Sequence, residues 1–200
     1  MKIIGLCAAL AFLASCAASS LVTQKKNPDY TGKPFKTILV VAVTSDEIVR
    51  RTFEDRIVAR LGQRGRKGIP GYVVVGKRGK ITEAELREAI TQSGAEGVLV
   101  TRVTGVDTGS VTVPGAEVTI GYGWGGFYGY YAGVWETAYI PSQQVSGSSS
   151  TLTETRLFDA KSGVLVWTGV VRTGDGNNLD AVLSGYVELI FDAMESDRVI

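Results

Sequence analysis

The stretch Thr37-Ile-Leu-Val-Val-Ala-Val43 indicates the fold class of this chain. Its unbroken run of aliphatic, mostly β-branched residues is typical of a strand that is buried on both faces of a sheet. Thr44 and Glu47 follow with the spacing of a capping box, and apolar residues then recur at helical spacing as far as Leu61. A buried strand followed at once by an amphipathic helix predicts an α/β layer.

The pattern continues along the chain. We predict a strand at 71–76, a helix that begins at the capping box of Thr82 and Glu85 and ends at Gly94, and a strand at 97–103. Further strands are expected at 117–120, 149–159 and 164–171, with a tight turn at 160–163, and a final helix at 178–196. The predicted fold is a single α/β domain with a mixed sheet and about three helices, in the order β-α-β-α-β-β-β-β-α.

The N-terminus has the pattern of an export signal. Lys2 precedes an apolar run, Ile3–Ala14, that is shorter than the roughly 20 residues of a membrane-spanning helix. Residues 1–15 are therefore interpreted as a signal peptide. Leu13-Ala14-Ser15-Cys16 resembles the lipobox of bacterial lipoproteins, which implies that Cys16 is acylated and becomes the first mature residue. The alternative is ordinary signal cleavage near Ala17 with no lipid.

This resemblance also implies a location. In such lipoproteins an aspartate after the acylated cysteine favours the inner membrane, whereas here the next residue is Ala17. We therefore expect an outer-membrane lipoprotein that faces the periplasm, with the inner membrane as the less favoured alternative. Residues 16–36 are interpreted as the lipidated cysteine and a flexible tether of up to about 65 Å, and residues 37–200 as the α/β domain.

The composition excludes several kinds of chemistry. The 200 residues include no histidine, and the two cysteines both lie within the first 16 positions. Ser-His-Asp and Cys-His catalysis and His-containing zinc sites are therefore excluded. The 21 basic and 20 acidic residues nearly cancel, which argues against a general nucleic-acid-binding protein. We expect no enzyme activity, no cofactor and no metal, and leave the oligomeric state open.

Residues 121–139 form the least ordinary segment, because aromatic residues and glycines alternate there. Its eight aromatic residues are Tyr122, Trp124, Phe127, Tyr128, Tyr130, Tyr131, Trp135 and Tyr139. We interpret the segment as a candidate interaction loop, since clustered exposed aromatics often mark a contact surface. Three alternatives stay open: contact with a membrane surface, contact with a protein or glycan, or a loose excursion with some rings folded onto the domain.

Two glycine patterns resemble nucleotide-binding motifs but lack their context. The first, at 71–77, has Arg78 where a phosphate loop needs Ser or Thr, and the second, at 121–126, is followed by residues that do not favour a helix. Asp175-Gly-Asn-Asn178 lacks the ligand series of a calcium loop. A run of eight basic residues between Arg56 and Lys80 contrasts with an acidic C-terminal region, and we favour two separate clusters over one anion-binding patch.

The order of elements resembles small bacterial envelope lipoproteins of the DUF4136-like kind, and those that activate penicillin-binding proteins or serve curli secretion. The likeness rests on Ile38–Val43, on Arg50–Asp55 and Leu61, on Ser93–Val100, and on the pair Thr155–Asp159 and Gly163–Trp167. It implies a non-enzymatic role through contacts with an envelope protein or cell-wall polymer. Cys16 is the one residue whose function this resemblance implies. The alternative is a carboxylate-based hydrolase that acts on cell-wall material.

Overall fold

The computed structural model describes residues 19–75, 82–107, 126–137, 150–174 and 179–200. Its centre is a six-stranded sheet in the order β1-β6-β5-β4-β2-β3. The strands are β1 (Ser19–Lys26), β2 (Thr37–Val43), β3 (Lys67–Pro70), β4 (Gly97–Asp107), β5 (Ser150–Asp159) and β6 (Leu165–Thr173). The helices are α1 (Glu47–Gln63), α2 (Gly71–Val74), α3 (Glu83–Ser93), α4 (Phe127–Thr137) and α5 (Leu179–Ser196).

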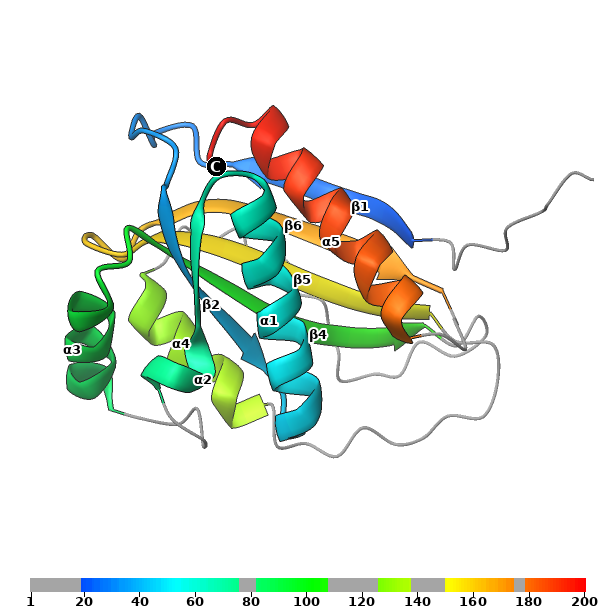
Figure 1. Ribbon diagram of the computed structural model, residues 1–200, viewed down its shortest axis with the longest axis horizontal. Helices are drawn as coiled ribbons and strands as arrows, with labels where there is room; N and C mark the ends of the chain where they lie inside the picture. The colour runs from blue at the N-terminus through cyan, green and yellow to red at the C-terminus, as the bar shows by residue number, and fades with distance from the viewer. Residues whose placement is uncertain (1–18, 76–81, 108–125, 138–149, 175–178) are drawn as a thin grey trace, which may run out of the picture.

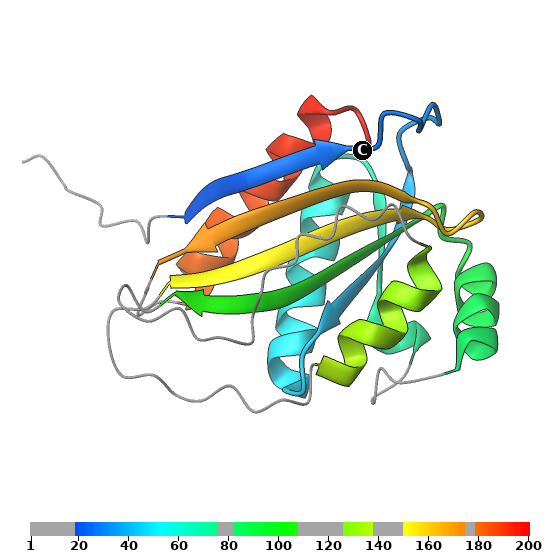
Figure 2. The same cartoon turned by 180° about the vertical axis from the view of Figure 1, so that it is seen from behind.

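The sheet is mixed, as the sequence predicted. β2 is parallel to both β3 and β4, whereas β4, β5, β6 and β1 pair antiparallel in turn. It follows that β2, β4 and β6 end at the same end of the sheet at which β1 and β5 begin. Helices α1 and α5 cover one face (Figure 1), and α2, α3 and α4 pack on the other (Figure 2).

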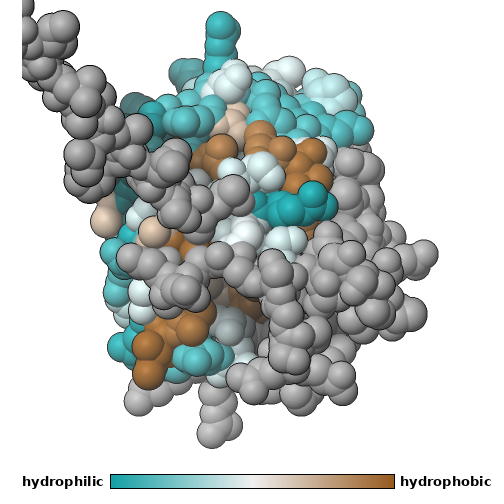
Figure 3. Space-filling model, turned by 90° about the vertical axis from the view of Figure 1, so that its right-hand side faces the viewer, coloured by the Kyte–Doolittle hydropathy of each residue, from teal (hydrophilic) through white to brown (hydrophobic). Residues whose placement is uncertain are grey.

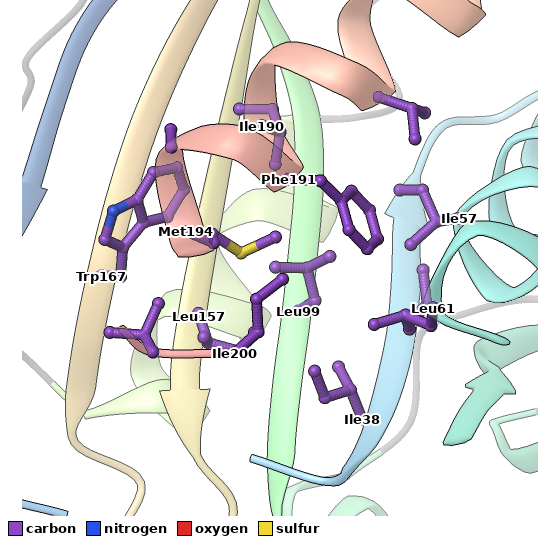
Figure 4. Packing of buried hydrophobic residues seen from close by; sticks show 14 of the residues in the cluster. Ile38, Ile57, Leu61, Leu99, Leu157, Trp167, Ile190, Phe191, Met194 and Ile200 are labelled. Carbon is purple, nitrogen blue, oxygen red and sulfur yellow. The ribbon is translucent and has the colours of Figure 1, made fainter. Parts of the chain in front are cut away.

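β2 is buried on both faces, because its side chains alternate between two cores. Ile38, Val40 and Ala42 point toward α1 and α5, whereas Leu39 and Val41 point toward the other helices. The first core is shown in Figure 4, where Leu99 and Leu157 of the sheet meet residues of both helices and the C-terminal Ile200 folds over them. This alternation confirms the prediction made from the opening stretch.

Several local predictions are confirmed. The capping box of Thr82 and Glu85 is present, and Gly94 ends α3 in the left-handed conformation. Asp159 starts the β5–β6 turn by accepting hydrogen bonds from the amides of Lys161 and Ser162. The α1 capping box is wrong, however: Asp46 is the N-cap, and its carboxylate accepts from the first-turn amides.

The predicted strand at 71–76 is wrong over residues 71–74. The strand β3 lies earlier, at Lys67–Pro70, and Gly71 begins the short helix α2. Proline cannot donate to a strand ladder, which favours the end of β3 at this point. A Cβ at Gly71 would lie 2.7 Å from the carbonyl oxygen of Val40, so the close approach of α2 to β2 requires glycine there.

The predicted tether is also wrong over residues 19–26. Ser19–Lys26 forms the edge strand β1, which pairs antiparallel with β6. Beyond it, the Asn27 side chain is buried and donates to the carbonyl of Leu165, and Phe35 lies in the core. Hydrogen bonding to β6 offsets the weak strand pattern of this polar segment. The predicted strand at 117–120 and residues 16–18 lie outside the described residues.

Candidate binding site

A cavity of about 330 Å³ lies between the first turns of α1 and α5, at the end of the sheet where β1 begins. Figure 3 views the molecule from this side, where hydrophobic surface lies beside polar residues. The described residues that line it are Ala42, Val43, Thr44, Val49, Phe53, Thr101, Arg102, Val103, Thr151, Thr153, Thr173, Gly174, Val182, Leu183 and Tyr186. The walls are mainly apolar, and the polar groups are mostly hydroxyls.

The sequence of the strands explains why space remains at this end. Along the face covered by α1 and α5, β5 carries Leu157 in the core but only threonines toward its start. β4 likewise changes from Leu99 to Thr101 on the same face. Because alternate residues of a strand share a face, these smaller side chains fall in one region, and the two helices bridge over it.

Two hydroxyls of the cavity floor, those of Thr101 and Tyr186, form a buried group with the hydroxyl of Thr155. Thr101 Oγ1 lies 3.1 Å from Thr155 Oγ1 and 3.4 Å from the Tyr186 hydroxyl, and Tyr186 also hydrogen-bonds Thr155. Burial raises the pKa of Tyr186 to about 12. The phenol therefore stays protonated at neutral pH, and the three groups satisfy one another instead of offering a charge.

A buried charge cluster lies on the opposite face of the sheet, beneath α4. The carboxylate of Glu154 accepts from Arg102 Nε at 2.9 Å and from Arg156 Nη2 at 2.7 Å, and the Tyr130 hydroxyl donates to it at 3.1 Å. Desolvation alone would raise the pKa of Glu154, but the two guanidinium groups outweigh it and hold this pKa below its ordinary value of 4.5. Glu154 is therefore a fixed anion that connects α4 to the sheet.

Replacing Glu154 with glutamine is expected to reduce the loss of stability on acidification. Because the folded-state pKa lies below the unfolded one, this carboxylate stabilises the fold above about pH 4.5, and its contribution is lost as the pH falls through the folded pKa. Glu154→Gln should therefore show a smaller fall in the free energy of unfolding between about pH 5 and about pH 3. Urea titrations at each pH measure this, with exposed Glu83→Gln as the control. An unchanged pH dependence in Glu154→Gln would contradict the assignment.

Residues 127–137 form the helix α4 and not a loop, and the described aromatic rings fold onto the domain, as the third alternative expected. Phe127 and Tyr131 are buried in the core beside Phe158, and Tyr130 bonds Glu154. Tyr128 is half-buried under the Arg87 guanidinium, 3.6 Å from the ring centroid. The packing of this aromatic face on the sheet offsets the cost of its glycines. Tyr122, Trp124, Tyr139 and the side chain of Trp135 lie outside the described residues, so their role stays a prediction.

The glycine pattern at 121–126 is followed by a helix after all, since α4 begins directly after Gly126. The described strands on either side of α4 are β4 and β5, which are antiparallel neighbours. A dinucleotide fingerprint needs a parallel βαβ unit, so the pattern still lacks its context.

Part of the basic run pairs with the acidic C-terminal region. Arg56 binds Asp180, Arg60 binds Glu188, and Arg64 binds both Asp192, at 3.2 Å, and Glu195. These ion pairs connect the exposed edges of α1 and α5. The arginines of α1 are thus engaged within the chain, which favours a structural role for them. Lys77, Arg78 and Lys80 lie outside the described residues.

The carboxylates of the described residues do not form a paired site in the cavity. Glu154 and Asp159 lie at different positions along β5, and the strand register places them opposite Arg102 and Gly97. An open hollow of about 370 Å³ at the other end of the sheet contains Glu96 and Asp159. Glu96 accepts from the amides of Lys36 and Thr37, and Asp159 accepts from the following turn.

Within the described ranges, no group of three or more Asp, Glu, Cys or His residues is placed to hold a metal ion. No helix in the described part of the chain is both long enough and apolar enough to span a membrane.

Comparison with known proteins finds similarity to solved structures at low sequence identity. No family model matches the sequence, and no curated protein matches it. The PelC dodecamer from Paraburkholderia phytofirmans is similar with a TM-score of 0.47 and 14% identity, over 92% of this chain and 99% of that chain. A single-residue variant of that PelC gives a TM-score of 0.46 and 13% identity, over 88% and 96% of the two chains. Similarity at this level assigns no role to any residue here.

Proposed function

We propose that this protein is a lipid-anchored binding or scaffold module of the bacterial cell envelope. Cys16 would carry the lipid, and the domain would face the periplasm from the outer membrane. It would act through contacts with an envelope protein or cell-wall polymer, without catalysis. The predicted likeness to small envelope lipoproteins is part of this proposal.

The observation that carries the proposal is the position of β1. The strand begins at Ser19, three residues after Cys16, and it is hydrogen-bonded to β6. Three residues span at most about 11 Å. An acylated Cys16 would therefore hold the folded domain directly at the membrane surface, whereas the tether expected from the sequence would have allowed it to move far away. A partner of this module would lie close to the same membrane.

Replacing Cys16 with alanine should release the protein from the membrane fraction. One acyl chain anchors only marginally, and the several chains on a lipoprotein cysteine make the attachment stable. The wild type should sediment with membranes and yield an N-terminal peptide with added acyl mass. The Cys16→Ala protein should lose that mass and its stable attachment. Cell fractionation and peptide mass spectrometry measure both results.

Cys7→Ala provides the matched control, since Cys7 lies inside the apolar run of the signal peptide. This variant should be acylated and sediment as the wild type does. Stable membrane attachment of Cys16→Ala, or an N-terminal peptide without acyl mass in the wild type, would contradict the proposed anchor.

The alternative function is hydrolysis of cell-wall material by two carboxylates. The hollow that contains Glu96 and Asp159 brings two carboxylates to one concave surface. Both already accept backbone amides, as structural carboxylates do. Release of soluble fragments from purified cell wall by the wild type, lost in Glu96→Gln and Asp159→Asn, would favour the hydrolase over the binding module.

A further inference from the structure

We propose that the cavity between α1 and α5 binds one acyl chain of the lipid on Cys16 of the same molecule. This inference rests on the proposed lipid attachment and adds a binding site to it. The cavity and the anchor have independent support, the first from the packing of the helices and the second from the N-terminal sequence.

The attachment point lies within reach of the cavity. Ser19 pairs with Thr173 in the sheet, and Thr173 lines the cavity. Neighbouring strands lie about 4.8 Å apart, and the three residues from Cys16 to Ser19 add at most about 11 Å. Ser19 Oγ also lies 3.3 Å from the position that a Cβ on Gly185 would occupy, next to Tyr186 in the cavity floor. The lipid would therefore start no more than about 16 Å from Thr173 in the cavity lining.

The chemistry of the cavity suits a hydrocarbon chain. Phe53, Val103 and Leu183 supply apolar walls, and the hydroxyls of the floor already bond one another. The described lining residues include no carboxylate, and the one guanidinium, that of Arg102, is bound to Glu154 on the other face of the sheet. Among the described lining residues, no unpaired charge is thus available for a charged ligand. The volume lies at the lower end of the roughly 300–1,000 Å³ found for ligand cavities, which suits one chain.

The opening carries apolar side chains that a hydrocarbon would cover. Val103 is 59% exposed and Val49 is 40% exposed, although both line the cavity. A chain on Cys16 is favoured over one from elsewhere, because covalent attachment gives it a high effective concentration at the opening. With one chain in the cavity and the others in the bilayer, this end of the sheet would face the membrane in a fixed orientation.

Photocrosslinking in intact cells tests the inference. The full chain carries p-benzoylphenylalanine in place of Val103, and the cells are irradiated before peptide mass spectrometry. We expect a link between the peptide of position 103 and the lipid-bearing peptide of Cys16, within a band of monomer size. The matched control replaces Val164, an exposed valine at the opposite end of the sheet, and should give a yield lower by about tenfold or more.

A second variant tests the cavity itself. With the photoreactive residue kept at position 103, Thr151→Trp adds a large side chain to the lining, and the yield of the link should fall by about tenfold. Near-native circular dichroism of this variant is required for the comparison. An unchanged yield would mean that the chain lies on the surface, and would overturn the inference.

The remaining outcomes separate the inference from the proposed function. Links from position 103 only to membrane phospholipid, or only to a second copy in a dimer band, would overturn the inference. An acylated Cys16 peptide with no link at position 103 would also overturn it while leaving the proposed function intact. A Cys16 peptide without acyl mass would overturn both.

Discussion

Replacing Phe127 with alanine is expected to lower the free energy of unfolding by about 3–5 kcal/mol, the usual cost of deleting a fully buried phenylalanine ring. Phe127 is 1% exposed, and its ring centroid lies 5.2 Å from that of Phe158 and 5.6 Å from that of Tyr131. The loss would detach the first turn of α4 from the sheet. Urea denaturation followed by circular dichroism measures the change.

Two controls make this result specific. Phe127→Leu keeps most of the apolar volume and should cost clearly less than the alanine variant. Ala132→Ser changes an exposed position of the same helix and should lie within about 0.5 kcal/mol of the wild type. If Phe127→Ala unfolds as the wild type does but loses a binding partner, residue 127 belongs to a contact surface and not to the core.

Replacing Glu54 with alanine is expected to lower the free energy of unfolding by a similar amount, about 3–5 kcal/mol, because it breaks a buried ion pair from one side. Glu54 and Arg50 are 0% and 1% exposed, and Arg50 Nε donates to the carboxylate at 3.1 Å. The same carboxylate accepts the amides of Ala42 at 3.0 Å and Tyr72 at 2.8 Å. Alanine would remove the buried counter-charge of Arg50 and the acceptor of both amides.

The comparison with Glu83 isolates the effect of burial. Glu83 pairs with Arg87 within α3 at 2.7 Å, also four residues apart, but both side chains are exposed to solvent. Glu83→Ala should therefore cost no more than about 0.5 kcal/mol. Chemical denaturation of both variants gives the two values side by side. A cost below about 1 kcal/mol for Glu54→Ala would contradict the prediction, because it would mean that the buried ion pair contributes little to the free energy of unfolding.

The contacts of Glu54 show why the sequence wrongly predicts a strand at 71–76. Burial raises the pKa of this carboxyl in spite of Arg50 and the two amides, so it occupies an unfavourable position for a charge. On a helical wheel, Glu54 interrupts the apolar stripe of α1, and the sequence alone does not indicate that its carboxylate is buried and accepts hydrogen bonds. Its partners are the end of β2 and the start of α2, and their meeting depends on the turn after Pro70. The sequence could not predict that turn from a segment rich in strand-forming valines.

The sequence does not predict the helix α4 for a related reason. Glycines at positions 129 and 133 lower the helix propensity of the segment, and the segment looks like a loop when it is considered alone. In the fold, Phe127, Tyr131 and Val134 lie on one side of the helix and bury against the sheet. This burial is a tertiary effect, and it outweighs the local preference.

The sequence by itself determined the α/β class, the two-faced burial of β2, the helices α1, α3 and α5 and the hairpin of β5 and β6. Each of these follows from a periodicity or a cap within a short window, where neighbouring residues dominate the energy. Only the tertiary structure decided that Ser19–Lys26 is an edge strand, that the aromatic segment contains a core helix, and that the acidic region neutralises Arg56, Arg60 and Arg64. Those features depend on partners more than 100 residues away for β1 and α1, or on a sheet face made by several segments, and no local pattern records such contacts.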